Sequence, residues 1–197
     1  MKNIIIRILS VIVIILLLIA FSSSYSFLNI ANLDYVVAIG FDTSTNNNYH
    51  ISFQFAKVSS VSESGKTEQT PTIINTVEAS SLNNAINLMN TYIGKKLNLS
   101  HCKVIVFSEE IANNGIASQI YSLINDTQIR PSANIIVSKC SAQYYIANSK
   151  PIFENLITKY YEVFPSSSDY TGYTADTTIG DFFNALECEL CEPTAIL

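Results

Sequence analysis

Residues 33–41 read LDYVVAIGF, a stretch that is apolar from Tyr35 onward and rich in β-branched side chains. Such a run is typical of a strand that is buried on both faces of a sheet. Residues 42–48 (DTSTNNN) follow it and are turn formers, whose side chains bond their own backbone. In residues 49–55 polar and apolar side chains then alternate, and one face carries Tyr49, Ile51, Phe53 and Phe55. The two segments therefore predict an antiparallel hairpin.

Further strand patterns come after the hairpin. Residues 73–79 alternate and predict a third strand, while 103–107 (KVIVF) and 134–139 (NIIVSK) predict buried strands. Between them, apolar residues recur at helical spacing over 82–93. Ser81 can cap this helix, and we expect Gly94 to take the left-handed position after it.

Helical patterns dominate the second half of the chain. Ser108 followed by Glu109 and Glu110 predicts a helix start, because a hydroxyl cap and acidic side chains suit the positive end of a helix dipole. Thr178 is a second potential cap. The other predicted helices or helical stripes cover 116–124, 142–147, a segment opened by Pro151, and 179–186.

This order predicts an α+β fold, with a mixed β-sheet and helices packed on it. We expect an N-terminal apolar membrane helix or signal segment before it. The expected domains are a signal peptide or membrane anchor (1–26), an α+β extracytoplasmic domain (27–178) and the start of a further, apparently truncated region (179–197).

The N-terminal segment indicates export. Lys2 and Arg7 precede an apolar run from Ile8 to Phe21 that only Ser10 interrupts. A positive start and about 14 apolar residues fit a secretory signal peptide. With residues 4–6 included, the run reaches the roughly 18 residues that span a bilayer. Cleavage stays open, because weak small-x-small patterns end at Ser22 and Ser24.

Composition excludes some classes of function. The net charge is −5, so the chain lacks the excess of positive charge that attracts nucleic acid, and we expect no nucleic-acid partner. Four cysteines in 197 residues are too few for a small disulfide-stabilised scaffold, and the fold must depend on its core.

The residues that could bind a metal or act in catalysis are better explained by structural roles. His101 and Cys102 lack a third metal ligand or catalytic partner, because the only other histidine is His50 on the hairpin. Cys188 and Cys191 form a single CxxC, which is half of a zinc knuckle at most. A redox CxxC begins a helix after a strand, whereas this one follows a predicted helix. We expect incidental thiols or an adventitious disulfide there.

Nothing else in the chain predicts catalysis. There is no Gly-x-Ser-x-Gly motif and no glycine-rich phosphate loop. Glu109 and Glu110 are neighbours on a helix and point apart, which favours a dipole role over an acid–base pair. Tyrosines at 160–161 and 170–173 fit either a recognition surface or half-burial at the edge of the core. We therefore predict no catalytic, cofactor-binding or metal residue and no cofactor, with Gly40 and Gly94 serving backbone geometry at most.

Taken in order, the motifs of this chain resemble the N-terminal region of the Ger(x)C family. The resemblance covers roughly residues 33–197. The residues that carry it are Gly40-Phe41-Asp42, Gln54, Ser81-Leu82, Ala85-Ile86, Gly94-Lys95-Lys96-Leu97, His101, Val104-Ile105-Val106, Ser108-Glu109-Glu110-Ile111-Ala112, Gly115, Arg130 and Asn134.

The resemblance implies a non-catalytic subunit of a spore germinant receptor on the outer face of the inner spore membrane. Its partners would be the membrane and the integral-membrane A and B subunits of the receptor, and the complex would start germination in response to nutrients. The alternative is an extracytoplasmic solute-binding module that itself holds a nutrient.

The chain departs from the family pattern in two ways. Family members usually carry a lipobox cysteine after the signal peptide, but no cysteine precedes Cys102, and residues 22–26 stand in its place. We therefore predict no lipidation residue, so the apolar segment would be the anchor. Family chains are about twice as long, which leads us to expect a fragment or a truncated product.

Overall fold

The computed structural model describes residues 2–22, 33–45, 48–56, 72–149, 154 and 156–197. They form two units, Met1–Asn32 and Leu33–Leu197. In the first, α1 (Lys2–Ser22) exposes its apolar side chains over residues 4–19. Among the described residues, no helix is long and apolar enough to cross a membrane.

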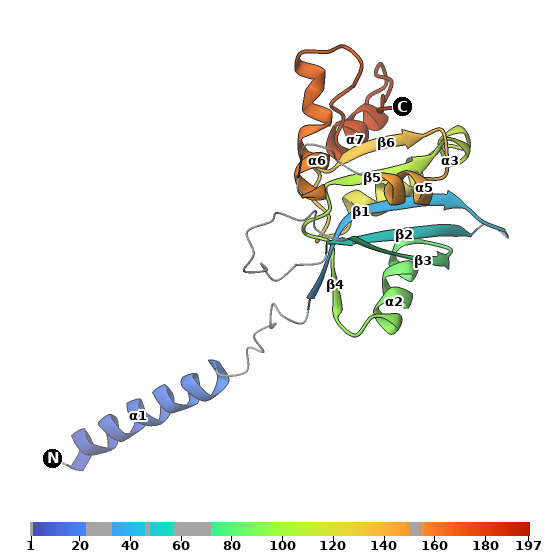
Figure 1. Cartoon of the computed structure of the whole chain (residues 1–197). Helices are drawn as coiled ribbons and strands as arrows, with labels where there is room; N and C mark the ends of the chain where they lie inside the picture. The colour runs from blue at the N-terminus through green and yellow to red at the C-terminus, as the bar shows by residue number, and fades with distance from the viewer. Residues whose placement is uncertain (1, 23–32, 46–47, 57–71, 150–153, 155) are drawn as a thin grey trace, which may run out of the picture. The chain divides into compact units, whose positions relative to one another are not determined.

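The second unit is built on a six-stranded mixed sheet (Figure 1). Its main path has the order β3-β2-β1-β5-β6, and β4 pairs in parallel with the start of β1. The pairs β1–β2 and β2–β3 are antiparallel, whereas β1, β5 and β6 run parallel. The strands are β1 (Leu33–Thr43), β2 (Tyr49–Ala56), β3 (Thr72–Ala79), β4 (Lys96–Asn98), β5 (Val104–Ser108) and β6 (Asn134–Ser138).

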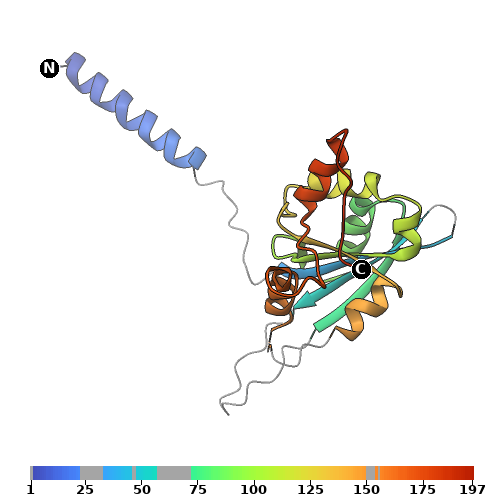
Figure 2. The same cartoon turned by 90° about the horizontal axis from the view of Figure 1, so that it is seen from above.

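Helices cover both faces of this sheet (Figure 2). We call one side the α2 face; it is covered by α2 (Leu82–Tyr92), α3 (Glu109–Asn113), α4 (Ala117–Ile124) and α7 (Ile179–Glu187). We call the other the α5 face; it is covered by α5 (Ala142–Asn148) and α6 (Ile157–Val163), and the 3₁₀ helix η2 (Pro165–Asp169) follows α6. The predicted α+β class and mixed sheet are confirmed.

Strand β1 supplies both cores, as its apolar residues 35–41 predict. Ile39 and Phe41 lie in the core of the α2 face, whereas Val37 and Ala38 lie in that of the α5 face. Two successive residues can share a face because the register with β2 shifts between Val36 and Ala38.

Most of the predicted helix boundaries are confirmed. The hydroxyls of Ser81 and Ser108 cap α2 and α3, and Thr178 forms a capping box with Asp181 at the start of α7. Glu109 and Glu110 occupy the first turn of α3. These caps could be predicted from the sequence because each cap side chain bonds an amide of its own helix, only a few residues away.

The prediction for Gly94 is wrong. Helix α2 ends at Tyr92, and its cap Ile93 has extended backbone (φ −94°, ψ 142°). The amide of Ile93 bonds the carbonyl of Met89, and the side-chain oxygen of Asn90 accepts a hydrogen bond from the amide of Leu97 at 2.9 Å. Among the described residues the glycines with positive φ are Gly115 (90°) and Gly172 (46°).

The short elements β4 and η2 were not predicted. The predicted loop 59–70 and Pro151 lie outside the described residues. The helix predicted from Pro151 begins later than expected, at Ile157, because Glu154 and Leu156 are described and are not helical. Residues 179–197, predicted to start a further region, contribute to both cores. Ile179 and Phe182 lie in the core of the α2 face, and Ile196 lies in that of the α5 face.

Candidate functional site

The end of β1 holds the start of α5 through the Asp42 carboxylate. Its Oδ1 accepts a hydrogen bond from the amide of Ala142 at 2.7 Å, and its Oδ2 accepts one from Gln143 at 2.9 Å. The hydroxyl of Ser141 accepts a third bond, from the amide of Tyr144. These bonds satisfy amides that have no partner inside the helix, and the negative charge lies at the positive end of its dipole.

Gly40 allows α5 to lie close to the sheet. A Cβ at this position would lie 2.8 Å from Cδ1 of Ile146 and 3.1 Å from Cβ of Ala142. The glycine is therefore needed for close approach. The Gly40-Phe41-Asp42 motif thus has a structural explanation, since its first residue admits the helix and its last residue caps it.

A buried polar network joins β2, α5 and α6. Gln54 is 1% exposed; its Nε2 donates to the carbonyl of Ile146 at 3.2 Å, and its Oε1 accepts from the hydroxyl of Tyr161 at 2.9 Å. Burial raises the pKa of Tyr161 above its usual range, so the hydroxyl stays protonated as a donor. From the sequence, this role was missed, although a polar residue within a buried strand was the available signal.

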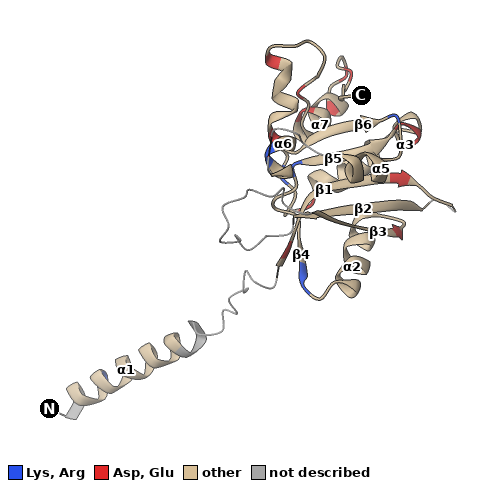
Figure 3. Cartoon of the chain, in the orientation of Figure 1, with Lys and Arg blue, Asp and Glu red and all other residues tan. Residues whose placement is uncertain are grey.

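A polar cleft of about 520 Å³ lies where the parallel strands end. Figure 3 shows acidic residues at the ends of β1 and β3 on this side. Asp42 caps α5, and the hydroxyl of Thr43 donates to Glu110 at 2.6 Å, so two of the carboxylates already serve the fold. Other lining residues include His50, Ser108, Glu109, Lys139 and Cys140.

A second cleft, of about 480 Å³, lies where β5 and β6 begin. Lys103 and Glu162 line it with their ammonium and carboxylate groups 3.9 Å apart. Asn134 also lines it; the residue is 9% exposed, and its buried Oδ1 has no hydrogen-bond partner in the described structure.

His101 and Cys102 lie at the rim of the second cleft but do not form a reactive pair. The His101 ring packs edge-to-face on Tyr35, with ring centroids 4.9 Å apart. Cys102 is buried, its thiol donates to the carbonyl of Val104, and burial raises its pKa to about 12. A thiol in this state is a poor nucleophile at neutral pH. Within the described part of the chain, no three His, Cys, Asp or Glu residues are placed to hold a metal ion.

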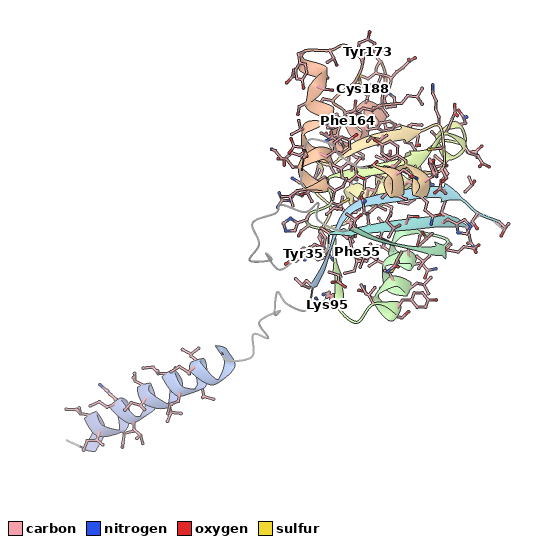
Figure 4. The ribbon with its side chains drawn as sticks, viewed as in Figure 1. Tyr35, Phe55, Lys95, Phe164, Tyr173 and Cys188 are labelled. Atoms are coloured by element: carbon pink, nitrogen blue, oxygen red, sulfur yellow. A yellow bond between two sulfur atoms is a disulfide. The ribbon has the colours of Figure 1, made fainter. Side chains whose placement is uncertain are left out.

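Cys188 and Cys191 form a disulfide directly after α7. In Figure 4 the label of Cys188 lies beyond β6, whereas that of Phe55 lies at β2. The pair follows the helix and does not begin it, in agreement with the position that the sequence indicated. Of the two free cysteines, Cys102 is buried and Cys140 is exposed.

The tyrosines separate into two groups. Tyr161 is in the core of the α5 face, and Tyr160 packs against that core with its pKa raised by burial. Tyr170 and Tyr173 are 76% and 97% exposed, so of the two alternatives half-burial is wrong for them. They are available for contact with a partner.

One comparison with known proteins gives a match, and it covers most of the chain. A family model described as the spore germination protein N-terminal domain matches residues 27–196. No curated protein and no solved structure matches the chain. The match includes the second unit entirely except for its last residue.

Proposed function

The chain belongs to the Ger(x)C family, whose N-terminal region it carries, and it has a role in spore germination; from this premise we propose that it is a non-catalytic subunit of a spore germinant receptor on the inner spore membrane. The observation that carries the proposal is the family match over residues 27–196. The partners that we propose are the integral-membrane A and B subunits of such a receptor.

The contacts of the reactive side chains support the non-catalytic part of this proposal. Asp42 caps a helix, Cys102 is buried as a thiol, and Tyr161 donates inside the core. Each of these groups thus has a structural role that accounts for its position. The chain would instead act through contacts with other proteins.

We further propose that residues 1–26 export the second unit and tether it to the membrane. Support comes from the apolar run Ile8–Phe21, which comes after Lys2 and Arg7. Positive residues before an apolar segment favour a cytoplasmic N-terminus, with the residues after the segment outside. The second unit would then lie on the extracytoplasmic face of the inner spore membrane.

Nutrient-triggered germination tests the proposal. Spores that lack the chain should lose the fall in optical density that a nutrient causes, and expression of the full chain should restore it. A chain with Cys188→Ser and Cys191→Ser is the matched control: it should restore the response fully, because the proposal gives the disulfide no chemical role. An unchanged nutrient response without the chain would contradict a receptor role.

A solute-binding module is the second candidate, and the polar cleft of about 480 Å³ lined by Lys103, Glu162 and Asn134 favours it. A ligand that binds only the folded state raises the melting temperature in proportion to the logarithm of its concentration. Thermal melting of the full chain with amino acids and sugars, compared with Asn134→Leu, measures this directly. A rise that the variant abolishes would favour solute binding, and no rise with any compound would remove this candidate.

A further inference from the structure

The polar cleft of about 520 Å³ lies where the chain leaves two neighbouring parallel strands toward opposite faces of the sheet (Figure 1). After β5 the chain enters α3, whose Ile111 packs in the core of the α2 face. After β6 it enters α5, whose Ala142 and Ile146 pack in the core of the α5 face. In open sheets with parallel strands, ligands bind in the crevice that such a divergence leaves outside the carboxyl ends of the strands. The volume is also within the roughly 300–1,000 Å³ of pockets that hold small molecules.

Two opposite charges line this cleft from adjacent strand ends. Ser108 and Ser138 are partners in the register of β5 with β6, and Glu109 and Lys139 are the residues that follow them. Both charged side chains are exposed. Neighbouring strands lie about 4.8 Å apart, yet the two groups form no ion pair within the described part of the chain. The carboxylate and the ammonium therefore remain available to a ligand.

The other carboxylates of the cleft already have partners in the fold. Asp42 accepts hydrogen bonds from two amides of α5, and Glu110 accepts one from the hydroxyl of Thr43. No three metal-binding side chains are placed together among the described residues, whereas a single carboxylate is enough to bind an ammonium group through a charge-assisted hydrogen bond. Glu109 therefore suits an organic ammonium group.

The cleft also contains hydroxyl donors. Ser108 is 6% exposed, and its oxygen accepts a hydrogen bond from the amide of Ile111 at 3.4 Å. The oxygen of Ser141 accepts one from the amide of Tyr144 at 3.1 Å. Because a hydroxyl has one hydrogen in addition to its lone pairs, both serines can still donate. Two hydroxyl donors and the ammonium of Lys139 together suit a carboxylate.

We propose that this cleft binds a free amino acid, with its ammonium group on Glu109 and its carboxylate on Lys139, Ser108 and Ser141. A zwitterion pairs with both charges of the cleft at once, whereas an amine or an acid would leave one of them without a partner. The inference goes beyond the proposed receptor role, because binding needs only this chain and no membrane partner. The site is also separate from the cleft of about 480 Å³ at the other end of β5 and β6.

Calorimetric titration of the full chain in detergent with each of the standard amino acids tests this site. At least one amino acid should bind. The matching amine, which lacks the carboxylate, and the matching acid, which lacks the ammonium group, should each bind about tenfold more weakly or worse, because each loses a charge-assisted contact.

Two variants test the assigned contacts. Glu109→Gln and Lys139→Gln each remove one charge at an exposed position and should each weaken binding about tenfold or more. Glu189→Gln and Lys96→Gln are the matched controls, since they make the same changes at exposed positions outside the cleft, and they should leave the affinity unchanged. The melting temperature of each variant without ligand establishes that it is folded.

Three results would overturn the proposal. The first is that no standard amino acid binds at millimolar concentration. The second is that the matching amine or acid binds as tightly as the amino acid, which would mean that only one of the two charges is used. The third is that Glu109→Gln and Lys139→Gln bind as the natural chain does, which would place the amino acid elsewhere on the molecule.

Discussion

On the α2 face the sheet meets its helices through apolar side chains, whereas on the α5 face polar groups set the position of the helix. Phe107 and Phe41 stack on the α2 face with ring centroids 5.0 Å apart. On the α5 face, Asp42 and Gln54 bond α5, and Gly40 gives it room. Apolar packing tolerates rearrangement, while a buried polar network requires one geometry. The α5 face should therefore respond to small chemical changes that the α2 face would absorb.

The largest effect is expected on the α2 face, from loss of volume. Phe107→Ala removes a fully buried ring and leaves a cavity, which should lower the free energy of unfolding by about 3–5 kcal/mol. Urea unfolding followed by circular dichroism measures this. Tyr173→Ala, at a 97% exposed position, is the control and should leave stability nearly unchanged. A cost below about 1 kcal/mol for Phe107→Ala would show that this face is not tightly packed.

A smaller change on the α5 face should have a clear effect. Tyr161→Phe removes one hydroxyl and leaves Oε1 of Gln54 buried without its donor, at a cost of about 1–3 kcal/mol. The double variant with Gln54→Leu should cost less than the sum of the two single variants, because both partners are then removed. Additive costs would mean that the two side chains are not coupled.

Gly40→Ala should destabilise by about 1–3 kcal/mol, because the added methyl overlaps α5. Gly94→Ala is the matched control: a Cβ there meets nothing within 4 Å, and the change should stay within about 0.5 kcal/mol. Comparing the melting temperatures of the two variants distinguishes the effect of overlap with α5 from the general effect of replacing a glycine. Equal shifts would contradict the role given to Gly40.

Alkaline pH should give the smallest effect and should act through the α5 face. Burial raises the pKa of Tyr145 to about 12 and also raises that of Tyr161, against roughly 10 in an unfolded chain. The unfolded state therefore loses these protons first, so stability is full below pH 10 and falls as the pH rises through 12. Tyr145→Phe should reduce this fall in urea titrations between these pH values. The same slope with and without Tyr145 would contradict the assignment.

The two faces also differ in how much of them the sequence predicted. Helix α2 was predicted, over 82–93, from apolar spacing and its Ser81 cap, which are signals within one helix. The bonds of the α5 face join residues separated by 92, 100 and 107 positions, and no local pattern reports such pairs. The prediction for Gly94 rested on the local pattern alone, and it missed the bond by which the side chain of Asn90 holds the amide of Leu97, beyond the end of the helix.

Co-purification is the most direct test of the receptor-subunit account. Tagged full chain would be expressed in sporulating cells, the inner spore membrane solubilised, and the bound proteins identified by mass spectrometry. The account predicts recovery with two polytopic membrane proteins, the A and B subunits, and unchanged recovery for the Cys188→Ser, Cys191→Ser variant. Recovery of the chain alone in a soluble cell-surface fraction would contradict it.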